Sequence, residues 1–326
     1  NYTIKPLDPG NYDLKSTFVG YQTVEVTGII VSANKITYQD VKLQKGVALG
    51  EVKIIEYKKP LLDKDNLAGQ TKTAEEIVAL PTKSVTTIAA TSAGIYQRDE
   101  GDDAINIRGS RDNATEYYID GIKVRGAISP PSSAIEQITV ITGGLEAKYG
   151  DATGGIISIA TKGPAAKFGG GFEIVSSSLF DDYNYNLGQV YLTGPIIKKQ
   201  LADGTKRSIL GYFISTEFTM VDDPDPSAIG IWKVKDNVLN DLRKNPFVYN
   251  ETGGFKSSSN FLTPNDYENV QAKPNAARTI LNASAKLTFQ PVINTTLTLG
   301  GSYYDRKRND YSDSYSMFTP EANRHS

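Results

Sequence analysis

The stretch NIRGSRDNATEYYIDGIKVRG, residues 106–126, determines how the rest of the chain is interpreted. Its apolar residues alternate as in short strands, and Asp120-Gly121 between two apolar runs is a strong hairpin signal. Charged residues and glycines lie among the apolar ones: Arg108, Gly109, Arg111, Asp120, Gly121, Arg125 and Gly126. This composition is unsuited to a dry core. It predicts a domain that sits in a wet, polar enclosure and packs closely through its backbone.

The composition excludes several classes of function. The chain has 326 residues, which is enough for two or three domains, and a formal net charge of −2 with scattered Lys and Arg. That balance predicts no nucleic-acid partner. Cysteine is absent, and the only histidine is His325. Thiol nucleophiles, iron–sulfur centres, Cys-based zinc sites and disulfide scaffolds are therefore excluded, and we expect neither a His-based metal site nor a catalytic triad. We predict no enzymatic activity, no cofactor and no metal site.

The residue usage favours a β-rich protein. Tyrosine, threonine, valine and isoleucine are frequent, and no run of 18 apolar residues exists. A membrane barrel remains compatible with this pattern, because its strands show only weak alternation over roughly 10 residues. The first residues, NYTIKPLDPGNYDL, lack the features of a signal peptide. We therefore expect the natural N-terminus to lie upstream.

The first 66 residues form two segments. Residues 1–46 alternate with a turn at Asp8-Pro9-Gly10, which predicts part of a small antiparallel β-sandwich or another short β-module. Residues 47–66 begin with the alternating stretch GEVKIIEY and end in charged residues. This stretch is either a strand of the preceding domain or a segment that adds as a strand to a partner's sheet edge.

Residues 67–163 mix helices and strands. TAEEIVAL predicts a short helix with Thr73 as its N-cap and Glu76 at the capping-box position. A second helix is expected after Ser84, ending by Gly94. The strands AINIRG, EYYIDG, IKV, QITVIT and GGIISIATKG follow, so we predict an α+β domain with glycines at its corners.

Residues 164–326 predict longer strands in pairs joined by short turns, with a long polar loop from about residue 222 to 273. Short turns on one side and a long loop on the other are typical of an outer-membrane barrel, although soluble sandwiches also alternate. Six aromatic residues suit an interfacial girdle: Tyr212, Phe213, Phe218, Phe289, Tyr303 and Tyr304. The segment supplies about five strands, whereas a closed barrel needs about eight. Either the polypeptide continues past Ser326 or these strands form no barrel.

Two motifs carry a resemblance to a known family. The first is IRG followed by IDG and a short strand, with Arg108-Gly109 and Asp120-Gly121. The second is IEQITVITGGLEAKYGDATGGIISIATKG, with Tyr149-Gly150 and Gly154-Gly155. In this order they resemble the plug domain of TonB-dependent outer-membrane receptors, in the form found in the SusC-like branch of the Bacteroidota.

The resemblance implies a mainly β fold with an α+β plug. It assigns residues 1–46 to a partial carboxypeptidase-regulatory-like β-sandwich, 47–66 to a linker with a candidate Ton box, 67–163 to the plug, and 164–326 to the first strands of an incomplete transmembrane barrel. The candidate Ton box departs from the commoner form of the motif and comprises Glu51, Val52, Lys53, Ile54, Ile55, Glu56 and Tyr57. Candidate ligand contacts in the plug loops are Arg111, Asn113 and Arg125.

The function implied by the resemblance is energy-coupled import of a nutrient across the outer membrane of a Gram-negative bacterium, with a periplasmic N-terminal module. The implied partners are TonB, outer-membrane lipid, a SusD-like surface lipoprotein and an unknown nutrient, such as a glycan, peptide or siderophore. One alternative is a non-transporting SusC-like subunit of an outer-membrane assembly or secretion complex. Another is an extracellular carbohydrate-binding or adhesive β-module, in which Tyr-rich loops stack on sugars.

Overall fold

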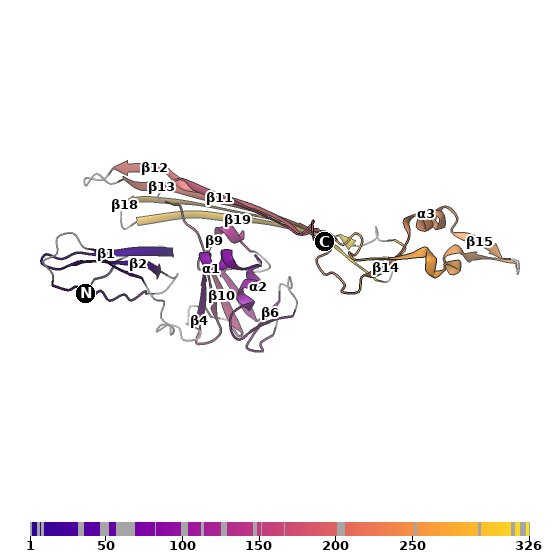
Figure 1. The fold of residues 1–326 in the computed structure, drawn as a ribbon, viewed down its shortest axis with the longest axis horizontal. Coiled ribbons are helices and arrows are strands. Elements are labelled where there is room, and N and C mark those ends of the chain that lie inside the picture. The colour runs from indigo at the N-terminus through magenta and orange to yellow at the C-terminus, as the bar shows by residue number, and fades with distance from the viewer. Residues whose placement is uncertain are drawn as a thin grey trace. The chain divides into compact units, whose positions relative to one another are not determined.

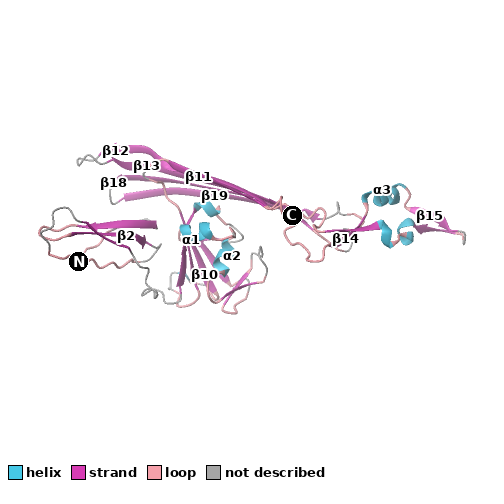
Figure 2. Ribbon diagram, viewed as in Figure 1, coloured by secondary structure: helices cyan, strands magenta, loops and turns pink. Residues whose placement is uncertain are grey.

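The protein is described from a computed structural model, in which strands dominate and helices are few and short (Figures 1 and 2). The structure describes residues 2–4, 7, 10–31, 36–45, 52–56, 69–81, 83–98, 104–111, 114–124, 129–145, 149–150, 152–165, 167–200, 206–250, 253–292, 295–313, 317–319 and 324–325. None of the helices in these ranges is long and apolar enough to cross a membrane.

The N-terminal module is one three-stranded sheet. It contains β1 (Gly10–Ser16), β2 (Thr23–Val31) and β3 (Val52–Glu56) in the order β1-β2-β3, with β1 antiparallel and β3 parallel to β2. Its small core is Val24, Val26 and Ile29, with Val41 and Leu43 packed against it. The predicted strand at residues 36–44 is not a strand of this sheet, but it contributes side chains to the core, and its Gln44 carbonyl accepts a hydrogen bond from the Gln22 N–H, 3.0 Å. Within the described residues the module contains a single sheet, and its assignment to part of a β-sandwich or to another short β-module stays a prediction.

The central domain is a mixed five-stranded sheet with two helices. The sheet order is β4-β9-β10-β7-β8, and only the β7–β10 pair is parallel among its neighbouring pairs. The elements of the domain are β4 (Gly69–Thr73), α1 (Ala74–Ala79), α2 (Val85–Ala90), β5 (Ile95–Gln97), β6 (Ile105–Ile107), β7 (Thr115–Ile119), β8 (Ile122–Val124), η1 (Ser132–Ala134), β9 (Ile135–Ile141) and β10 (Gly155–Thr161).

The two helices begin and pack for local reasons. Thr73 and Glu76 form the predicted capping box at the start of α1, where the Thr73 N–H donates to the Glu76 carboxylate, 3.0 Å. Ser84 precedes α2 without a capping bond, and its hydroxyl contacts that of Thr86 instead, 2.8 Å. Both helices join the apolar core of the domain, which consists of Ile77, Val85, Ile88, Ala89, Ile105, Ile107, Ile135, Ile138, Val140, Ile157 and Ile159.

Six further strands form a separate sheet, which we call the wall (Figure 1). They follow the order β11-β12-β13-β18-β19-β20. Their bounds are β11 (Gly169–Ser176), β12 (Asn186–Gln200), β13 (Lys206–Val221), β18 (Arg278–Val292), β19 (Thr295–Asp310) and β20 (Arg324–His325). Four of these strands have 15 or 16 residues, which exceeds the roughly 9–11 residues that a tilted strand needs to cross a bilayer.

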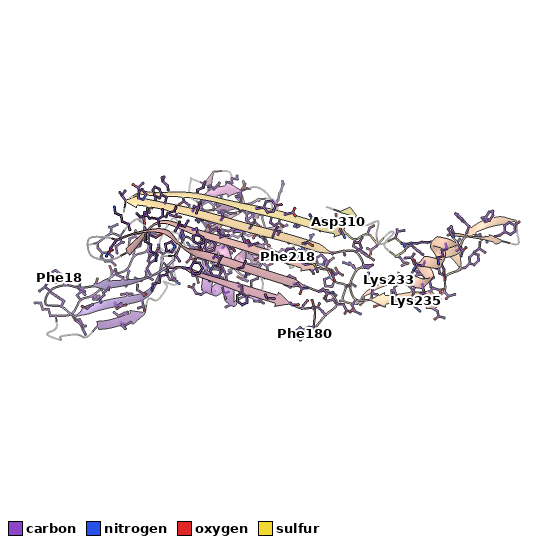
Figure 3. All side chains as sticks on the ribbon, turned by 90° about the horizontal axis from the view of Figure 1, so that it is seen from above. Phe18, Phe180, Phe218, Lys233, Lys235 and Asp310 are labelled. Carbon is purple, nitrogen blue, oxygen red and sulfur yellow. The ribbon has the colours of Figure 1, made fainter. Side chains whose placement is uncertain are left out.

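The wall buries polar side chains and exposes apolar ones. On β13, Glu217 is 7% exposed, whereas Phe218, labelled in Figure 3, is 46% exposed. The same inversion recurs on β12 and β18. The buried polar residues of the three strands are Gln189, Thr193, Ser215, Glu217, Thr219 and Asn282. The exposed apolar ones include Val190, Leu192, Ile214, Phe218, Leu287 and Phe289. A soluble sandwich shows the opposite distribution, because its apolar faces form the core.

One residue of the predicted aromatic girdle faces the other way. Phe213 is only 2% exposed, and its ring stacks on that of Tyr191 with centroids 6.0 Å apart. The girdle prediction is wrong at this position because Phe213 shares strand parity with Ser215 and Glu217, the buried face of β13.

The predicted polar loop between β13 and β18 is structured. It contains β14 (Ile231–Val234), α3 (Asp236–Lys244), β15 (Phe247–Asn250), β16 (Gly254–Ser257), η3 (Ser258–Phe261), η4 (Pro264–Asp266) and β17 (Tyr267–Val270). β14 pairs with β17, and β15 pairs with β16. Lys233, on β14, lies 3.0 Å from Asp236 and 3.1 Å from Glu268, and these bonds raise its pKa although burial opposes them. Such pairing explains how a polar segment acquires a defined conformation.

Candidate functional site

The candidate Ton box forms β3 and pairs with the N-terminal module. Its register runs from Thr23 opposite Val52 to Thr27 opposite Glu56. Glu51 and Tyr57 lie outside the described residues. Ile54 is 68% exposed and Ile55 is 39% exposed, and neither belongs to the core of the module. These two side chains are thus accessible, one on each face of the strand.

The IRG and IDG motifs adopt the same turn. Arg108 and Gly109 have φ of 51° and 77°, and Asp120 and Gly121 have φ of 49° and 81°. Positive φ at both central residues is the signature of a type I′ turn, which favours Gly at the second position. The second turn joins β7 to β8 as a hairpin, as predicted. The first is closed by a hydrogen bond from the Ser110 N–H to the Ile107 carbonyl, 3.0 Å.

The two sequence motifs meet in space. A Cβ atom on Gly154 would lie 2.8 Å from the Ser110 hydroxyl oxygen and 2.9 Å from the Ala114 carbonyl oxygen. On Gly155 it would lie 2.6 Å from a methyl carbon of Ile107. Both glycines therefore allow the start of β10 to pack directly against the IRG turn.

Tyr149 and Gly150 close the loop after β9. The Tyr149 ring is buried and meets the Tyr118 ring edge-on, with centroids 5.1 Å apart. Ile141 and Ile156 complete this cluster. Gly150 has a φ of 50°, a conformation that L side chains rarely adopt. The YG pair thus supplies an aromatic anchor followed by a turn.

Asp120 connects the central domain to the wall, through what we call the clasp: Asp120, Thr161 and Lys286. The Asp120 carboxylate accepts hydrogen bonds from the Thr161 N–H, 2.8 Å, and the Thr161 hydroxyl, 2.6 Å. Lys286, on β18, lies 2.9 Å from the same carboxylate and donates to the Thr161 carbonyl, 3.1 Å. The Lys286 side chain is 15% exposed. One lysine of the wall therefore contacts the ends of both β7 and β10.

A second set of contacts lies beside the clasp. The hydroxyls of Ser133 and Ser215 share a hydrogen bond of 2.6 Å, and Lys162 lies 5.3 Å from the centroid of the Tyr191 ring. Burial raises the pKa of Glu136, although the Lys162 charge opposes that shift. Burial lowers the pKa of Lys162, and the negative charge of Glu136 opposes this decrease. These partly buried charges attract each other within the central domain, beside its junction with the wall.

The predicted ligand contacts are only partly described. Arg111 is exposed in the loop between β6 and β7, whereas Asn113 and Arg125 lie outside the described residues. Across the ranges given above, no group of three or more His, Cys, Asp or Glu side chains is arranged to hold a metal ion. Sequence reasoning missed Thr161 and Lys286 as partners of Asp120. Thr161 lies within the second motif, two residues before its end, but no local pattern distinguishes Lys286 from other strand lysines.

Known proteins resemble parts of this chain. Residues 64–156 match the TonB-dependent receptor plug domain. The TonB-dependent transporter Oar of Myxococcus xanthus is 27% identical over 187 residues, which cover 52% of this chain and 17% of Oar. These matches support a TonB-dependent receptor.

Solved structures show the same fold at low identity. The siderophore receptor PirA of Acinetobacter baumannii superposes with a TM-score of 0.50 at 18% identity, covering 76% of this chain and 33% of PirA. A mutant of the ferric enterobactin receptor PfeA of Pseudomonas aeruginosa also gives 0.50 at 17% identity, covering 78% of this chain and 36% of that one. The chain therefore spans about a third of the length of these receptors.

Proposed function

We propose that the chain is the N-terminal part of a TonB-dependent outer-membrane receptor of the SusC-like type, which imports a nutrient by energy-coupled rearrangement of its plug. The plug is the central domain, which carries both sequence motifs and holds the wall through the clasp. The single observation that carries the proposal is this junction: a plug domain joined by Asp120 and Lys286 to a sheet with an inverted distribution of polar side chains.

The wall suits a position between lipid and a polar interior. Its exposed face carries Phe218, Ile214 and Leu192, which lipid tails solvate well. Its opposite face carries Ser215, Glu217 and Asn282, which suit a plugged, wet lumen. In this arrangement the N-terminal module is periplasmic, and the structured loop segment between β13 and β18 lies at the outer surface.

The proposed cycle uses the described elements in order. A nutrient contacts plug loops near Arg111, Asn113 and Arg125, TonB engages β3, and a pull through residues 57–68 rearranges the plug. The chemistry that is required is the breaking of hydrogen bonds and ion pairs, without covalent steps. A SusD-like lipoprotein is the expected surface partner. The matches to receptors and to a transporter do not favour the alternative of a structural subunit.

The lipid-facing assignment predicts different outcomes on the two faces of β13. Ile214→Lys places a charge in the middle of the exposed face of β13 and is expected to cost about 2–4 kcal/mol near the bilayer midplane. Glu217→Gln, on the opposite face of the same strand, keeps a polar group on the buried face and is the matched control. Assembly is measured as heat-modifiable, protease-resistant protein in outer-membrane fractions. Equal assembly of the two variants would remove the membrane assignment.

The import function is tested at β3. The double variant Ile54→Pro/Ile55→Pro removes two consecutive backbone N–H groups, one directed to each edge of the strand. We expect binding of the periplasmic domain of TonB to fall more than about tenfold, because strand addition depends on backbone hydrogen bonds. Growth on a nutrient that requires the receptor should fail in parallel.

The control for this test is Ile54→Ala/Ile55→Ala, which keeps the backbone and removes exposed side chains only. It is expected to retain most of the binding. If the unaltered protein does not bind TonB, or if the proline variant binds as tightly as the alanine variant, then residues 52–56 are not the coupling strand.

A further inference from the structure

We propose that β3 is a shared strand: one edge remains paired with β2 of the N-terminal module while the other edge accepts a strand of TonB. This inference rests on the proposed function and specifies how the coupling strand is engaged. In this proposal, a strand of TonB pairs with the outer edge of β3, and β3 stays paired with β2.

The sheet order leaves one edge of β3 open. In the order β1-β2-β3, this strand is terminal, and no strand within the described ranges pairs with its outer edge. Alternate residues of a strand direct their N–H and C=O groups to opposite edges. Pairing with β2 over Val52–Glu56 therefore uses only part of the backbone groups of β3. The remainder form a template for another strand.

Both faces of β3 are also accessible. Ile54 lies opposite Glu25, and Ile55 lies opposite the buried Val26. Neither isoleucine is buried, so an added strand can cover both side chains without first removing them from a core. Displacement of β3 would instead break its pairing with Thr23–Thr27 before any new bond forms. Addition is thus the route with the smaller loss of existing contacts.

The shared strand makes the module part of the mechanical connection. If β3 remains paired with β2, a pull by TonB acts on the module and on residues 57–68 together. If β3 were extracted, the module would stay behind. The two modes are distinguished by tying β3 to β2 covalently.

These 326 residues contain no cysteine, so an introduced pair cannot form a disulfide with another thiol of this segment. Glu25→Cys/Ile54→Cys places two thiols on neighbouring residues of β2 and β3. Adjacent strands lie about 4.8 Å apart, which is within the Cα separation that a disulfide spans. The full-length receptor carrying this pair, purified in detergent, is oxidised or left reduced and titrated with the periplasmic domain of TonB. We expect the dissociation constants of the two forms to agree within about threefold.

A loss of binding of about tenfold or more on oxidation, reversed by reductant, would overturn the shared-strand proposal in favour of extraction. Lys15→Cys/Glu25→Cys joins β1 to β2 in the same module and controls for cross-linking as such. If reduced Glu25→Cys/Ile54→Cys already binds poorly because Ile54 contacts TonB, Thr23→Cys/Val52→Cys provides a second pair in the same register.

The experiment distinguishes failure of the proposed import function from failure of the shared-strand proposal. If the unaltered chain does not bind TonB, then the proposed function fails, and this inference with it. If the unaltered and reduced chains bind TonB and the oxidised Glu25→Cys/Ile54→Cys chain does not, then only the shared strand fails. If the unaltered, reduced and oxidised proteins all bind TonB, then the proposed function and the shared-strand proposal are both supported.

Discussion

Asp120→Ala is expected to loosen the clasp at the ends of β7 and β10 and to destabilise the plug by roughly 2–4 kcal/mol. The substitution leaves the N–H and hydroxyl of Thr161 without their acceptor and leaves Lys286, a largely buried lysine, without its counter-charge. It also places alanine at a φ of 49°, which an L side chain without a polar group adopts poorly. Most of the effect should come from the lost hydrogen bonds, because the Asp120 side chain is 37% exposed and screening weakens the ion pair.

The measurement is amide hydrogen exchange at Thr161, whose N–H donates directly to Asp120. Tryptophan fluorescence is unsuitable, since the only tryptophan, Trp232, lies in the loop segment between β13 and β18. Asp120→Asn is the graded control: it retains one acceptor oxygen for Thr161 and a residue tolerated at positive φ, and it replaces the second oxygen with an NH2 donor and removes the charge. Exchange at Thr161 should be fastest in Asp120→Ala and intermediate in Asp120→Asn. Unchanged exchange in Asp120→Ala would show that the clasp does not hold β10.

Gly155→Ala is expected to destabilise the plug by about 1–3 kcal/mol, which is the usual cost of overpacking. The added methyl group would lie 2.6 Å from Ile107 and 2.9 Å from the Ile141 carbonyl oxygen, so both the side chain and the neighbouring strand must move. This is a large effect for a single methyl group, because Ile107 and Ile141 belong to buried clusters that have little room to adjust.

Resistance of the plug to limited proteolysis, followed by mass spectrometry, measures this effect in the full chain. Gly163→Ala is the matched control, because nothing lies within 4 Å of its added methyl group and its φ is not in the left-handed region. Equal protease resistance of the two variants would contradict the close packing of β10 on the IRG turn.

The elements that the sequence analysis predicted correctly are those decided by neighbouring residues. The capping box of Thr73 and Glu76 and the Asp120-Gly121 hairpin each depend on a few consecutive side chains. The parallel pairing of β10 with β7 was not predictable, because it joins segments whose separation along the chain leaves no local signal. The same holds for Lys286, whose role depends on its distance from Asp120 in space.

The orientation of Phe213 shows a further limit of sequence reasoning. Alternation identifies two faces of a strand but does not say which one meets the plug. An aromatic residue is compatible with either the exposed face or the plug-facing side of the strand. The burial of Glu217 and Ser215 shows that the face they share with Phe213 is the buried one. In such strands the polar residues indicate the direction more reliably than the aromatic ones do.

In the proposed cycle, the residues between β3, which ends at Glu56, and β4, which begins at Gly69, determine how far TonB must pull before tension reaches the central domain. Residues 57–68 can span at most ~43 Å when fully extended. The first pairing that such tension would load is that of the five residues of β4 with β9. Under this proposal, deletions within residues 57–68 shorten the required travel, and insertions lengthen it.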